Sequence, residues 1–237
     1  MTARGLSGGQ ATLAIARLAI VRAVRGKALW IAAATAVLPL IVVGVQASLG
    51  HTAETMWQTA FMLTLLTLPI VPSILIGPSL SDELEDKTSA YLWSRALPRW
   101  TIIAGKLAGL APVAAAIAMV SLGVAWLVMG GPGKVPVDTA VRGLAGVAAP
   151  ALVASALVAA LATLVPRHAV AVSVVYLLFV DKVVGELPIK LRYVSIAFGG
   201  RSVAGFDDLA AAPGALSLLV VGSVAVAIAI TRIGRME

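Results

Sequence analysis

The sequence has no cysteine and little charge, and each absence excludes a class of protein. Without cysteine there are no disulfide bonds, thiolate metal sites or cysteine nucleophiles. The two histidines, His51 and His168, are too few for a histidine-rich metal cage. Only 12% of the 237 residues are charged and 60% are apolar, whereas soluble domains are about 25% charged. The composition therefore excludes an ordinary soluble domain and indicates a membrane protein.

Long apolar runs divide the chain into membrane-spanning segments. A helix needs about 20 mainly apolar residues to cross a bilayer core of roughly 30 Å. Five charge-free runs have that order of length: Ala28–Leu49, Met56–Leu80, Leu107–Gly133, Gly143–Pro166 and Leu209–Thr231. A sixth run, Ala169–Val180, reaches it only with His168 and Asp181–Lys182 at its ends. The runs lack the alternation of a membrane β-barrel. We therefore expect an all-α polytopic membrane protein, with six transmembrane helices in a single domain over residues 1–237.

Three segments outside or at the ends of these runs have recognisable patterns. Ala11–Val24 mixes Arg17 and Arg22 with apolar residues, which predicts an amino-terminal helix in the membrane interface. Gly105 and Gly109 have the GxxxG spacing that allows a close helix neighbour. The segment Gly185–Asp208 is either a pair of short helices dipping back toward the membrane or an ordinary loop.

The distribution of basic residues predicts the orientation. With six spans and a cytoplasmic amino terminus, 12 Lys and Arg residues lie inside and 6 lie outside. The acidic residues number 5 inside and 6 outside, so the whole net charge of +7 falls on the inner face. This follows the positive-inside rule and places both termini in the cytoplasm. It also explains the basic charge without nucleic acid as a partner.

The sequence Leu6-Ser7-Gly8-Gly9-Gln10 spells LSGGQ, the signature loop of ATP-binding-cassette (ABC) ATPases. That loop acts only with a P-loop, G-x-x-x-x-G-K-[ST]. Gly133-Lys134 comes nearest to a P-loop, but Val135 follows it and the first glycine is missing. We therefore interpret residues 6–10 as part of a flexible amino-terminal tail and not as a nucleotide site.

The loop between the second and third runs is the most informative segment. An acidic cluster stands at its start, where a helix dipole favours negative charge, and a proline ends it. The residues are Glu85-Asp86-Lys87-Thr88, Tyr91-Leu92-Trp93-Ser94-Arg95, Pro98-Arg99-Trp100 and Gly105-Lys106. Helical spacing aligns Leu84, Thr88, Tyr91 and Leu92 on one face. The pattern predicts a short amphipathic helix along the membrane surface.

This stretch resembles the permeases of type-2 ABC exporters, which carry a pattern close to E-x-x-T-x-x-x-L-x-S-x-P-x-S-R-x-x-x-x-x-K after the second span. The chain departs from the pattern at Lys87, where glycine is common, and at Ala96-Leu97 before the proline. The resemblance covers about a tenth of the chain, and its place agrees with six spans and two inner termini.

The resemblance implies a transmembrane permease subunit of an exporter in the bacterial inner (plasma) membrane. It implies a separate ABC ATPase subunit that binds ATP and Mg²⁺, and a second permease copy or paralogue, while this chain holds no cofactor or metal and is not itself an enzyme. The ATPase would dock on the loop as a cytoplasmic coupling helix. The candidate docking residues are Glu83, Glu85, Asp86, Thr88, Tyr91, Leu92 and Arg95.

Asp181 and Lys182 are the other candidate site. They are either a buried ion pair on a translocation path, since charges within the membrane are functional by default, or anchors at the interface if the fifth span ends at Val180. The sequence leaves the substrate open. It also leaves other functions open: an ATPase-coupled subunit that transmits motion without transport, a secondary transporter, and a membrane enzyme, although the spans lack the clustered titratable groups that an enzyme needs.

Overall fold

The computed structural model describes residues 8–85, 100–206 and 210–235, and in these ranges the regular structure is helical throughout. Six helical stretches are long and apolar enough to cross a membrane. They are Lys27–Ser48, Ala53–Ser81, Trp100–Val128, Val137–Leu164, Pro166–Glu186 and Ala211–Gly234. The prediction of an all-α polytopic membrane protein with six spans is confirmed, and the sixth apolar run does reach spanning length.

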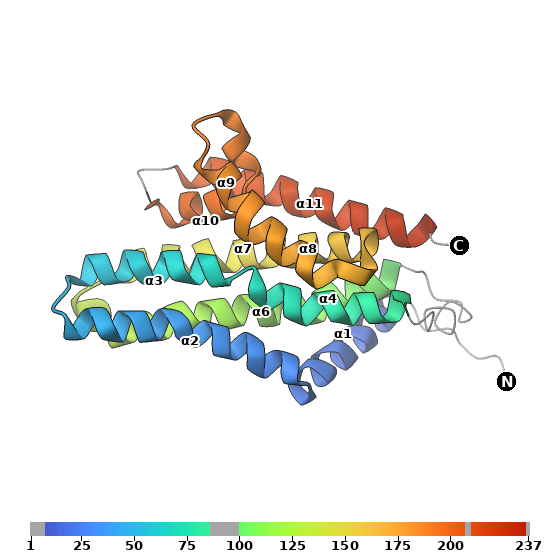
Figure 1. The fold of residues 1–237 in the computed structure, drawn as a ribbon, viewed down its shortest axis with the longest axis horizontal. Helices are drawn as coiled ribbons and strands as arrows, with labels where there is room; N and C mark the ends of the chain where they lie inside the picture. The colour runs from blue at the N-terminus through green and yellow to red at the C-terminus, as the bar shows by residue number, and fades with distance from the viewer. Residues whose placement is uncertain (1–7, 86–99, 207–209, 236–237) are drawn as a thin grey trace.

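Successive spans run in opposite directions along the long axis of the bundle, which is horizontal in Figure 1. The start of α1 (Gly8–Arg25) and the end of α11 (Ala211–Arg235) lie at the same end of the bundle. The end of α4 (Ile70–Glu85) and the start of α6 (Trp100–Val128) lie there too. We call this end the terminal end and the opposite one the distal end. Six spans, with the start of α1 and the end of α11 at one end of the bundle, agree with the predicted number of crossings.

The second span is two helices with a break at a proline. Helix α3 (Ala53–Thr67) ends before Pro69, and α4 begins at Ile70. Pro69 has no N–H to continue the hydrogen-bond ladder, and its ring clashes with the carbonyl four residues before it. Hydroxyl groups bond the carbonyls around the break: Ser73 Oγ donates to the Pro69 carbonyl at 2.7 Å. By contrast, Pro39, Pro78, Pro112 and Pro150 all lie inside continuous helices.

Helix α1 packs closely on α6, whose Gly105 and Gly109 form the point of contact. A Cβ at Gly109 would lie 2.6 Å from the Ala16 carbonyl oxygen, and one at Gly105 would lie 2.7 Å from the Ile15 side chain. The predicted role of the GxxxG spacing is confirmed. Helix α2 (Lys27–Ser48) follows α1 after Gly26. The prediction of a flexible tail over residues 6–10 is wrong for Gly8–Gln10, which form the first turn of α1; residues 6 and 7 lie outside the described ranges.

Helix α7 (Val137–Leu164) is the central element and packs against α4, α6, α10 and α11. Its many alanines allow these neighbours to approach. Short α10 (Ile196–Ala204) lies between α7 and α11 through glycine contacts. A Cβ at Gly200 would lie 2.7 Å from the Gly146 carbonyl oxygen, and one at Gly199 would lie 2.7 Å from Leu218 Cγ. The segment after the fifth span therefore returns to the bundle as short helices, the first of the two predicted alternatives, with a 3₁₀ turn at Lys190–Val194 before α10.

The fifth span changes its helical geometry along its length. A 3₁₀ turn at Pro166–His168 leads into α8 (Ala169–Val175), then a π-helical stretch at Tyr176–Val180, then α9 (Asp181–Glu186). Such π segments are rare and are frequently found at functional sites. At the terminal end α8 packs against α4. Toward the distal end α8 and α9 leave the layer of α3 and α4 (Figure 1).

Candidate functional site

The predicted coupling segment lies mostly outside the described residues. Glu83 and Glu85 belong to the last turn of α4, but the structure describes no side chain there. The other five docking candidates, Asp86, Thr88, Tyr91, Leu92 and Arg95, fall in the range 86–99, outside the described residues. The amphipathic helix and its docking role therefore stay predictions.

The two helices that flank this segment are joined by a buried lysine. Lys106 is 4% exposed, and its Nζ donates to the carbonyl of Ser79 on α4. An ammonium buried in a membrane bundle is costly unless polar groups meet it. The contact therefore ties the first turns of α6 to the last turns of α4, on either side of the predicted coupling segment. The sequence placed Lys106 at the inner interface and gave no sign of its burial.

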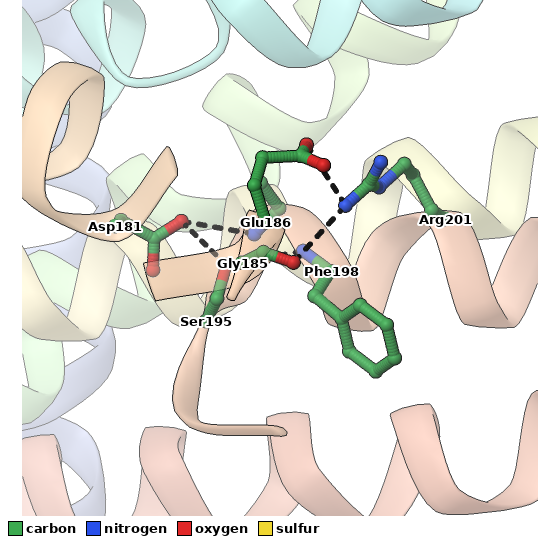
Figure 2. Close-up of polar contacts among 7 residues, drawn as sticks. Asp181, Gly185, Glu186, Ser195, Phe198 and Arg201 are labelled. Atoms are coloured by element: carbon green, nitrogen blue, oxygen red, sulfur yellow. Dashed lines mark hydrogen bonds and ion pairs between the residues drawn. The ribbon is translucent and has the colours of Figure 1, made fainter. Parts of the chain in front are cut away.

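Asp181 is 4% exposed and receives three hydrogen bonds from the start of α10. The backbone N–H of Ile196 donates to Oδ1 at 2.8 Å and that of Ala197 donates to Oδ2 at 3.0 Å. The Ser195 hydroxyl donates to Oδ2 at 3.1 Å and accepts from the N–H of Phe198 (Figure 2). The first N–H groups of a helix have no partner within the helix. A carboxylate is the natural cap for them because it meets the positive end of the dipole.

A second contact fastens the other part of α10 to α9. Arg201 forms an ion pair with Glu186 at 3.0 Å and donates to the Gly185 carbonyl at 3.3 Å, as Figure 2 shows. Gly185 is required here because a Cβ would lie 2.6 Å from Ser195 Oγ. We call the set Asp181, Gly185, Glu186, Ser195 and Arg201 the α9–α10 clasp. Sequence reasoning identified Asp181 but missed the rest, since residues ten to twenty positions apart share no local pattern.

Asp181 and its neighbour Lys182 have different surroundings. Lys182 is exposed, and within the described part of the chain it forms no hydrogen bond or ion pair. Its side chain lines a cavity of about 70 Å³ between α3 and the distal half of the fifth span. It also lines a wider cleft of about 460 Å³, which includes Gln58 and Thr59. Of the two candidate residues, Asp181 is therefore a buried cap of α10, and Lys182 is an exposed cation on the wall of the cleft.

The cavity and the cleft share the side chains of Met62, Leu66 and Lys182. The rest of the cavity wall is mostly apolar: Leu65, Pro69, Leu177, Leu178 and Ala197. Its remaining polar wall residues, Glu186 and Arg201, pair with each other. We call the cavity and the cleft together the α3–α9 cleft. Its walls are mostly apolar, and the cation of Lys182 lies at its distal end.

The fold and this site define a class, a multi-pass membrane protein with six helical spans and a partly polar cleft between the second and fifth. No protein-family model matches the chain, and no curated protein matches its sequence. In the described ranges, no three His, Asp or Glu side chains gather where they would hold a metal ion.

Proposed function

We propose that the chain is the permease subunit of an ABC exporter, working with a separate ATPase subunit that docks on residues 82–99. The observation that carries this proposal is the residue pattern from Glu85 to Lys106, which resembles the coupling segment of type-2 permeases. It begins after the second span and ends in the first turns of the third. Two further features support it. The start of α1 and the end of α11 lie at the same end of the bundle as the end of α4 and the start of α6, and six helical stretches are long and apolar enough to span a membrane.

The proposed mechanism is mechanical. ATP and Mg²⁺ bind to the ATPase partner, whose closure moves the coupling segment. Lys106 and Ser79 hold the helices on either side of that segment together, so a push on the segment would move α4 and α6 as a pair. Helix α4 contacts α7 and α8, and α6 contacts α1, α2 and α7. Motion would therefore reach most of the bundle, and two such permeases, either copies or paralogues, would form the path across the inner membrane.

The partner ATPase supplies the first test. The chain purified from its native membrane in mild detergent should bring a P-loop ATPase with it, and Glu85→Lys should weaken that association. Reversing a charge at a docking site acts on register and partner choice. Asp138→Lys is the matched control, because Asp138 is an exposed carboxylate at the first turn of α7, at the distal end. Equal ATPase recovery from wild type and the Glu85→Lys variant would contradict the docking assignment.

A second measurement distinguishes transport from motion alone. In proteoliposomes that contain both subunits, export would give ATP-dependent depletion of a substrate pool. A subunit that only transmits motion would hydrolyse ATP without depletion and would need a partner on the far side. ATP hydrolysis by the purified permease chain alone would contradict both.

A further inference from the structure

The α3–α9 cleft is a gap between two spans that the packing of a helical membrane bundle does not require. Helices α3 and α9 are not in close contact there, although α4 and α8 pack together toward the terminal end. The cleft wall includes Leu177 and Leu178 of the π-helical stretch. A π turn inserts one extra residue into a helix and so redirects the side chains that follow it. The cleft thus lies beside the π-helical stretch of the fifth span.

The electrostatics of the cleft are unbalanced. Arg201 is 14% exposed on its side chain and is paired with Glu186, so these two charges cancel. Asp181 is directed away, into the N-terminus of α10. Lys182 remains as a cation without a protein partner among the described residues, at the junction of the two hollows. A charge at the edge of an apolar region attracts an opposite charge more strongly than it would in open water.

We propose that the α3–α9 cleft binds an anionic amphiphile, a molecule with an alkyl chain and one phosphate-like head. The chain lies along Met62, Leu66 and Leu178, and the head contacts Lys182, with Gln58 and Thr59 as further hydrogen-bonding groups. The wider hollow of about 460 Å³ falls within the size of small-molecule sites, about 300–1,000 Å³. This names the substrate class of the permease; it rests on the proposed function only in treating the bound molecule as cargo.

The test compares two probes that differ only in head charge. They are hexadecyl phosphate and hexadecanol, each with a photoactivatable diazirine near the middle of the chain. The full-length protein is reconstituted in phosphatidylcholine vesicles, irradiated with each probe and digested for mass spectrometry. The phosphate should label α3 and residues 176–183 more than the alcohol does. Lys182→Gln should lower labelling by the phosphate by about three- to fivefold, the loss of one partly exposed ion pair, and leave labelling by the alcohol unchanged.

Matched variants locate the site. Lys134→Gln removes another exposed cation of the distal end, outside the cleft, and should have no effect. Met62→Trp should fill the cleft and reduce labelling by both probes, while Leu127→Trp, on the exposed side of α6, should not. Because no ATPase is present in these vesicles, failure of amphiphile binding is distinguishable from failure of the proposed ATPase coupling.

Three results would overturn the proposal. One is equal labelling of the cleft by the phosphate and the alcohol. Another is unchanged labelling by the phosphate in the Lys182→Gln variant. The third concerns a protein occupant: since the chain has no cysteine, a Met62→Cys variant can form a disulfide only between two copies. Complete disulfide formation in the vesicles would mean that a second copy covers the cleft.

Discussion

Replacing Asp181 tests how the distal end of the bundle is held together. Asp181→Ala would leave the N–H groups of Ile196 and Ala197 and the Ser195 hydroxyl without their acceptor. Loss of a helix cap alone costs about 0.5–2 kcal/mol, and a buried donor left unpaired costs about 1–3 kcal/mol. The two costs partly count the same N–H groups, so they do not add fully. We expect a loss of about 2–4 kcal/mol in the free energy of unfolding.

Thermal unfolding in detergent is the first assay. At about 2–4 °C per kcal/mol for a chain of this size, the Tm should fall by roughly 5–15 °C. Ser195→Ala removes one of these contacts, the bond to Asp181, together with the bond from the Phe198 N–H, and should give a smaller loss of about 1 kcal/mol. The double variant should lose less than the sum of the single ones, because the two side chains share a hydrogen bond.

Hydrogen exchange localises the effect. The amides of Ile196, Ala197 and Phe198 should exchange faster in Asp181→Ala, whereas amides in α1 should not change. Asp138→Ala is the control, since Asp138 is 65% exposed and its ion pair with Arg142 measures 3.7 Å; such pairs contribute about 0–1 kcal/mol. A Tm within about 1 °C of wild type, with unchanged exchange at residues 196–198, would refute the assignment of Asp181 as the cap of α10.

Two further predictions concern the amino-terminal helix and the topology. Gly109→Val should separate α1 from α6, because a Cβ would lie 2.6 Å from the Ala16 carbonyl oxygen, and proteolysis of α1 should become faster. Gly123→Val is the control and should have little effect, because the nearest atom to its Cβ lies 3.9 Å away. Equal rates of proteolysis in the two variants would contradict the packing of α1 on α6. Single cysteines placed at Ser89 and at Lys134 should react with a membrane-impermeant maleimide from opposite faces, Lys134 from outside intact cells; labelling of Ser89 from outside would reverse the proposed orientation.

Much of the fold follows from local sequence. The length of an apolar run decides whether it can span a bilayer, because unpaired backbone groups are so costly in lipid that a helix is required. The six spans, and with them the position of the start of α1 and the end of α11 at one end of the bundle, were predictable on that basis. The GxxxG spacing predicted the close contact at Gly105 and Gly109. The sequence also shows where the prolines are. It does not show that Pro69 breaks its helix while Pro39, Pro112 and Pro150 lie inside continuous helices. That choice depends on the neighbours that pack around each one.

Tertiary structure decided the character of the site. The sequence left open whether Asp181 and Lys182 pair with each other, because the partner of a buried carboxylate can lie anywhere in the chain. Residues 14 to 16 positions further on satisfy Asp181, and their approach depends on Gly185 having no side chain. Lys182 then lies on the cleft wall. Apolar lengths thus determine how often this chain crosses the membrane, while contacts between distant helices determine where its charges are buried and where they are left for a ligand.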